Sequence, residues 1–107
     1  MGLDISFTQV QEVELTSHNI THNLAQMAEE CGLYYPLWRP EEIFITKASE
    51  LLPLVEEGLA KLKADPEKYK EYNAPNGWGT YDNFVRFVEE VLQSCKEHPE
   101  AVISACR

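Results

Sequence analysis

The chain has 107 residues, of which 44% are hydrophobic, and its formal net charge at pH 7 is −9. This length suits one domain with a modest core, so we expect residues 1–107 to form a single unit. The acidic balance opposes non-specific binding to nucleic acids or to anionic membranes, because both need a basic footprint on the protein.

The cysteines indicate a reducing compartment. Cys31, Cys95 and Cys106 cannot all pair within one chain, and they form no CxxC motif for zinc or redox chemistry. The amino terminus lacks a charged region followed by an apolar one, and no run approaches the roughly 18 apolar residues of a membrane span. We therefore expect a cytoplasmic protein without a membrane partner.

Strand patterns lie at the two ends of the chain. Between Asp4 and Leu15 apolar and polar residues alternate, which predicts one long bent strand or a hairpin that turns near Gln9–Gln11. The tail Ala101–Cys106 is short, apolar and β-branched, and this pattern predicts a last strand beside the first.

Helical spacing of apolar residues follows the first strand region. Ile20–Cys31 reads as a helix, with Asn19 and Thr21 as candidate caps and Gly32 as its stop. The next segment, Tyr34–Glu42, contains Pro36 and Pro40. We expect an irregular loop there, because proline lacks an N–H and restricts the residue before it.

Three further helices are expected in the second half. Ala48–Leu62 has a strong apolar stripe with Thr46 as a candidate cap, and Pro53 either kinks this helix or separates its first turn. Asp65-Pro66 is typical of a short helix start, and Thr80 of a cap for the helix that begins at Tyr81. The whole pattern predicts an α+β domain, with two or three antiparallel strands and three to four helices packed on one face.

Most of the unusual residues lie in three segments, Ser17–Asn23, Tyr34–Glu42 and Asn73–Asn83. Trp38 and Arg39 together could stack on an aromatic ring and bind a phosphate. The alternative is that Trp38 packs at the edge of the core while Arg39 pairs with a neighbouring glutamate. In the third segment Gly77 and Gly79 flank Trp78, so the backbone could approach another group closely before a helix N-terminus.

Catalytic and metal-binding motifs are weak. His18 and His22 are four residues apart, but no third ligand completes a metal site. No serine or cysteine has an identifiable base and orienting partner. The sequence therefore favours a non-enzymatic protein without a cofactor, with acid–base chemistry by His22 and a glutamate as a weaker option.

Four motifs of this chain are long enough to be specific: NITHNL, LWRPEE, ITKAS and NGWGTY, at residues 19–24, 37–42, 45–49 and 76–81. Through these motifs the chain resembles a family of small uncharacterised proteins from bacteriophage and bacterial genomes, and the resemblance runs from Asn19 to Arg107. It implies a phage or prophage context, in which sequestration of ligands and inhibition of host defence are common.

Our leading expectation is a binding protein that sequesters a small anionic, nucleotide-like ligand such as a cyclic nucleotide. The expected ligand-binding residues would stack on the base, contact the phosphate and bind polar edges of the ligand: His22, Asn23, Tyr35, Trp38, Arg39, Asn76, Trp78 and Tyr81. A pocket in so small a domain is often completed by a second copy, so we expect a homo-oligomer. The alternative is an acidic inhibitor that occupies a basic groove of a host protein.

Overall fold

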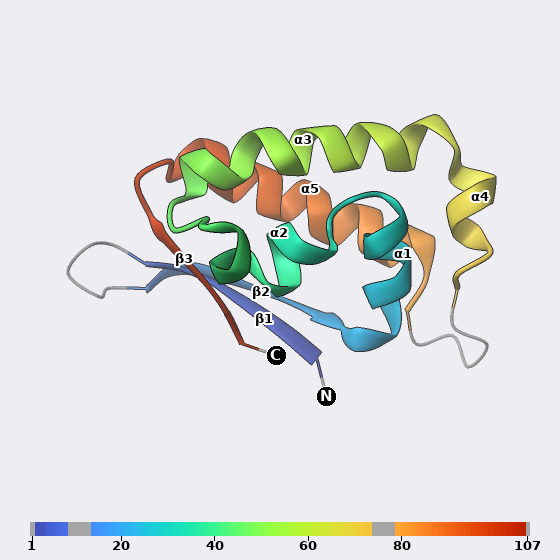
Figure 1. The fold of residues 1–107 in the computed structure, drawn as a ribbon, viewed down its shortest axis with the longest axis horizontal. Coiled ribbons are helices and arrows are strands. Elements are labelled where there is room, and N and C mark those ends of the chain that lie inside the picture. Colours follow the sequence, from blue (N-terminus) through green and yellow to red (C-terminus); the bar gives the residue numbers. More distant parts are fainter. Residues whose placement is uncertain (1, 9–13, 74–78, 107) are drawn as a thin grey trace.

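A computed structural model gives the fold and describes residues 2–8, 14–73 and 79–106 (Figure 1). Strands β1 (Gly2–Thr8) and β2 (Glu14–Thr21) pair antiparallel, and β3 (Val102–Cys106) pairs antiparallel with the other side of β1. The sheet order is thus β2-β1-β3, with the first strand in the centre. The expected α+β class and the pairing of the last strand with the first are confirmed, and the hairpin alternative applies to the amino-terminal region.

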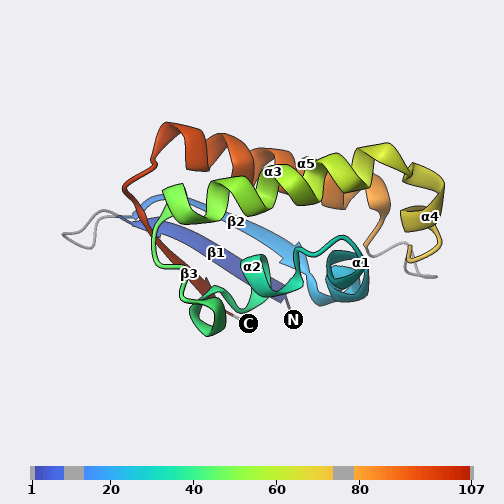
Figure 2. The same cartoon turned by 45° about the horizontal axis from the view of Figure 1, so that its top comes forward.

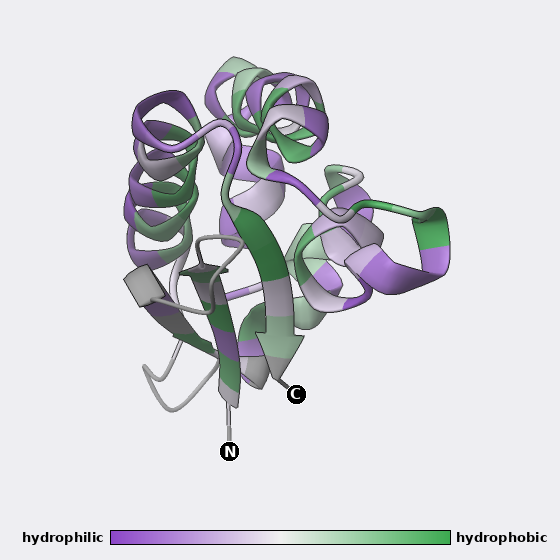
Figure 3. Cartoon of the chain, turned by 90° about the vertical axis from the view of Figure 1, so that its left-hand side faces the viewer, coloured by the Kyte–Doolittle hydropathy of each residue, from purple (hydrophilic) through white to green (hydrophobic). Residues whose placement is uncertain are grey.

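Alternation along β1 sets the two faces of the sheet. Leu3, Ile5 and Phe7 are buried, whereas Asp4 is exposed and Ser6 is half-buried. Successive side chains of a strand point to opposite faces, so one face of β1 packs on the helices and the other faces solvent. Figure 3 shows this arrangement end on, with the helices on one side of the three strands.

The predicted start of the first helix is wrong. Asn19 and Thr21 belong to β2, a short 3₁₀ helix η1 (His22–Leu24) follows, and helix α1 covers only Ala25–Glu30. Asparagine and threonine suit a cap, but β-branched threonine also suits a strand, and here the pairing with β1 prevails. Gly32, with φ of +81°, ends the helical segment as predicted.

The expected irregular loop at Tyr34–Glu42 is also wrong. Helix α2 (Tyr34–Trp38) contains Pro36, and a 3₁₀ helix η2 (Pro40–Ile43) follows it. Pro36 lies in the first turn of α2, where its missing N–H would have no intrahelical partner. Pro40 likewise begins η2, so each proline occupies a position that a helix tolerates.

Two long helices cover the sheet. Helices α3 (Ala48–Ala64) and α5 (Tyr81–Glu97) lie side by side above the strands, and the short α4 (Pro66–Lys70) lies at one end of the pair (Figure 2). Pro53 lies inside α3, which continues past it, so a separate first turn is excluded. Thr80 caps α5 as predicted, because its hydroxyl accepts a hydrogen bond from the Asn83 N–H at 3.3 Å.

Candidate functional site

The segment between α2 and α3 presents an apolar side chain to solvent. Phe44 is 86% exposed, more than any other large apolar side chain in the described part of the chain. Its backbone is left-handed, with φ of 61°. Among the described residues other than glycine, Phe44 alone has a positive φ. Figure 3 shows that this segment projects from the side of the molecule.

Folding does not explain a phenylalanine at this position. The left-handed conformation costs an L-residue about 1–2 kcal/mol, and glycine would adopt it without that cost. The exposed ring gains little burial in return. An aromatic side chain in a strained and exposed turn therefore suggests a functional role, since such outliers cluster at binding sites.

The chain before Phe44 is braced by local contacts. The Arg39 guanidinium donates a hydrogen bond from Nη1 to Glu42 at 2.7 Å and from Nε to the Tyr34 hydroxyl at 3.0 Å. The Ile45 N–H donates to the Pro40 carbonyl at 2.9 Å and closes the turn around Phe44. The contacts with Tyr34, and then those with Glu42, raise the pKa of Arg39, so the brace stays charged.

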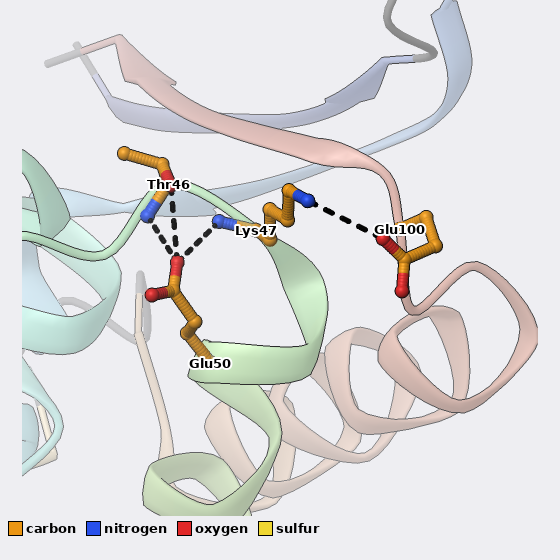
Figure 4. Close-up of polar contacts among 4 residues, drawn as sticks. All are labelled: Thr46, Lys47, Glu50 and Glu100. Atoms are coloured by element: carbon orange, nitrogen blue, oxygen red, sulfur yellow. Dashed lines mark hydrogen bonds and ion pairs between the residues drawn. The ribbon is translucent and has the colours of Figure 1, made fainter.

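The chain after Phe44 is braced by Glu50 at the start of α3 (Figure 4). Glu50 Oε1 accepts hydrogen bonds from the N–H and the hydroxyl of Thr46 and from the N–H of Lys47, each at 3.0 Å. These donors lower the pKa of Glu50, with the Thr46 N–H as the largest cause. The Thr46 carbonyl accepts from the Ile103 N–H at 2.8 Å, and Lys47 Nζ lies 3.4 Å from Glu100. Phe44 thus stands on a turn that is tied to α3 and to β3.

Two of the predicted stacking residues belong to the core. Trp38 is 2% exposed and stacks on Tyr34 at 5.8 Å between ring centroids. Tyr81 is 7% exposed, and its hydroxyl donates a hydrogen bond to the Leu62 carbonyl at 2.7 Å. Neither ring offers an open face to a ligand in this structure.

The other two predicted residues of the second segment, Tyr35 and Arg39, differ in how freely their side chains could contact a ligand. Tyr35 is 50% exposed, whereas the Arg39 guanidinium is bound by Tyr34 and Glu42. The structural alternative for Arg39, a pair with a neighbouring glutamate, is therefore the arrangement that the structure shows.

The first and third segments meet at Gly79. Its φ is +117°, and a Cβ at that position would lie 3.1 Å from the Thr21 side chain and 3.2 Å from those of Asn23 and Leu24. Asn73 Oδ1 accepts a hydrogen bond from the Tyr81 N–H at 2.7 Å across the base of the third segment. Asn23 is exposed beside this junction. Predictions for Asn76, Trp78 and the His22 side chain lie outside the described residues.

A polar cluster between β2 and α5 was not predicted from the sequence. His18 Nε2 lies 2.7 Å from Ser94 Oγ, and its Nδ1 lies 3.7 Å from Glu90. The geometry is that of a nucleophile, a base and an orienting carboxylate. However, Ser94 is buried, and the His18 ring packs edge-on against Phe7 and Phe87. The burial of the hydroxyl and the packing of the ring are typical of a structural contact, so we interpret the cluster as a satisfied polar contact between the layers.

Five of the nine basic side chains are paired with carboxylates of the protein itself. The ion pairs are Arg39 with Glu42, Lys47 with Glu100, Lys61 with Glu57, Lys63 with Glu89 and Lys70 with Glu67. The chain has 18 acidic and 9 basic residues, so pairing leaves an excess of carboxylates at the surface. Such a surface attracts cationic partners.

Comparison with protein-family models, with curated proteins and with solved structures finds no match to this chain. Among the described residues, no group of three histidine, cysteine, aspartate or glutamate side chains could hold a metal ion. In the same residues no helix is both long and apolar enough to cross a membrane.

Proposed function

We propose that the protein is a non-enzymatic binding protein whose acidic surface docks on a basic protein partner. The observation that carries this proposal is the excess of 18 acidic over 9 basic residues, together with the pairing of five of those basic side chains to carboxylates of the protein itself. In the phage context that the resemblance implies, the partner would be a host protein with a basic groove for nucleic acid.

The test is capture by the immobilised protein, followed by a functional assay of what is captured. The partner should be basic, should dissociate as salt rises, and should lose its nucleic-acid binding when this protein is added, because salt screens exposed charges. Partners that are acidic or neutral, and that stay bound at about 1 M salt where the Debye length is about 3 Å, would contradict the proposal.

The nucleotide-like ligand stays a second proposal, supported by the junction at Gly79. With Trp38 and Tyr81 in the core, stacking would depend on Tyr35 or on residues outside the described part of the chain. The test is thermal unfolding with a panel of nucleotides and cyclic nucleotides. A ligand at about 100 times its Kd should add roughly 2.7 kcal/mol, and Asn23→Ala should reduce that gain.

The homo-oligomer and the cytoplasmic location stay predictions. Sedimentation equilibrium and cell fractionation, respectively, would test them.

A further inference from the structure

We infer that Phe44 is the anchor of the docking surface, and that the partner offers an apolar socket bordered by lysine or arginine. This inference rests on the proposed function and adds to it the residue and the chemistry of the contact. Three independent features support it: the exposure of Phe44, the strain of its backbone and the charge around it.

Exposure and preorganisation make Phe44 suitable as an anchor. Interfaces depend on a few aromatic or arginine side chains that fill pockets of the partner. A side chain that is already held in position loses less conformational entropy on binding. The turn is closed by the bond from Ile45 to Pro40 and is tied on its far side by Glu50 and by Ile103.

The charges around Phe44 indicate which charge the residues that border the partner's socket should carry. The two cations of this region, Arg39 and Lys47, pair with Glu42 and Glu100. Glu41 and Glu50 add two exposed carboxylates to these two pairs, so the four carboxylates of this region outnumber its two cations. Glu50 also accepts hydrogen bonds from Thr46 and Lys47. An apolar side chain among acidic ones fits an apolar socket with a cationic rim.

Two synthetic peptides of equal length and charge separate the apolar contact from the electrostatic one. The first alternates leucine with lysine, and the second has glutamine in place of leucine. The wild-type protein should bind the leucine peptide on the order of tenfold to a hundredfold more tightly, which corresponds to burial of one phenylalanine side chain. Fluorescence anisotropy at low salt would measure both affinities.

Phe44→Gly is the decisive variant, because glycine suits the left-handed turn and the protein should unfold at a temperature no lower than the wild type. This variant should lose most of the preference for leucine and should keep the salt-sensitive binding of both peptides. Phe44→Leu should retain part of the preference. Tyr35→Ala, which removes another exposed aromatic side chain, is the matched control and should keep all of it.

The outcomes distinguish the two proposals. If Phe44→Gly prefers the leucine peptide as strongly as the wild type does, Phe44 is not the anchor, while the acidic docking function remains supported by the salt dependence. If neither peptide binds the wild-type protein at low salt, the docking function itself is contradicted.

Discussion

At the scale of single residues, His18 joins the sheet to the helices and carries a titratable group into their interface. Burial lowers the pKa of His18, and the Glu90 carboxylate opposes this shift only in part. The unfolded chain, with a histidine pKa of about 6.5, therefore binds a proton at a pH at which the folded protein does not. The stability that the neutral ring contributes is present above the pKa of the unfolded state, and it is lost as the pH falls through the lower pKa of the folded state.

We expect the midpoint of thermal unfolding to fall between pH 7 and pH 5 by more in the wild type than in His18→Gln. The measurement is calorimetry across this pH range. Parallel slopes for the wild type and His18→Gln would show that His18 does not govern the loss.

The buried cysteines allow a second prediction at this scale. Burial raises the pKa of the Cys31 thiol to about 11 and that of Cys95 to about 12. The thiolate is the reactive form, so both residues should resist alkylation at pH 8 while the protein is folded. Mass spectrometry after iodoacetamide treatment should find them modified only in denaturant. Alkylation of either residue in the native protein at the rate of a free thiol would contradict this prediction.

At the scale of elements, Gly58 sets how closely α3 approaches the segment after α1. A Cβ at Gly58 would lie 2.3–2.6 Å from three carbons of the Leu33 side chain, which is fully buried. Glycine in a helix is costly by itself, and here it allows the two backbones to approach. The contact therefore decides whether a glycine-to-alanine change raises or lowers the free energy of unfolding. Without the contact, alanine would stabilise the helix.

Gly58→Ala should lower the free energy of unfolding by about 1–2 kcal/mol, because overpacking outweighs the gain in helix propensity. Denaturant unfolding measures this change. The double variant Gly58→Ala with Leu33→Ala tests the cause, since alanine at 33 removes the clash. Gly58→Ala should then cost less in that background than in the wild type, and an equal cost would place its origin elsewhere.

At the scale of the whole molecule, the excess of carboxylates predicts opposite effects of salt on stability and on binding. With a net charge of −9, self-repulsion destabilises the compact state, and salt screens it. The unfolding temperature should therefore rise with sodium chloride while affinity for a basic partner falls. A neutral osmolyte should change that affinity less than sodium chloride does. An unfolding temperature that falls with salt would mean that the surface ion pairs outweigh the repulsion.

Strong periodicity made part of this fold predictable. Helix α5 has an apolar stripe over its full length and a threonine cap, and β1 alternates cleanly. Helix α2 was missed because Pro36 argues against a helix only outside the first turn. The start of α1 was misplaced because Thr21 also suits a strand, and because the pairing of Asn19 with Asp4 of β1 is a tertiary contact that local sequence does not show.

The candidate site was less predictable than the fold. Sequence alone cannot tell that Trp38 is buried or that Phe44 is exposed, since both lie in short apolar stretches beside prolines or charges. No residue type near Phe44 signals a left-handed backbone, for which glycine or asparagine is usual. His18 lies in β2 opposite the buried Ile5 of β1, whereas the sequence pattern predicts strand only between Asp4 and Leu15, so the cluster did not follow from it.

The central position of β1 has a consequence for the order of folding. Its neighbour β3 lies at the other end of the chain, so that the hydrogen bond from Thr8 to Val102 joins residues 94 positions apart. Closing so long a loop costs conformational entropy before any pairing is gained, and such non-local contacts slow folding. During synthesis β1 can form its hairpin with β2 early, but its other edge stays open until β3 leaves the ribosome. That edge is the part of the nascent chain most in need of protection from other strands.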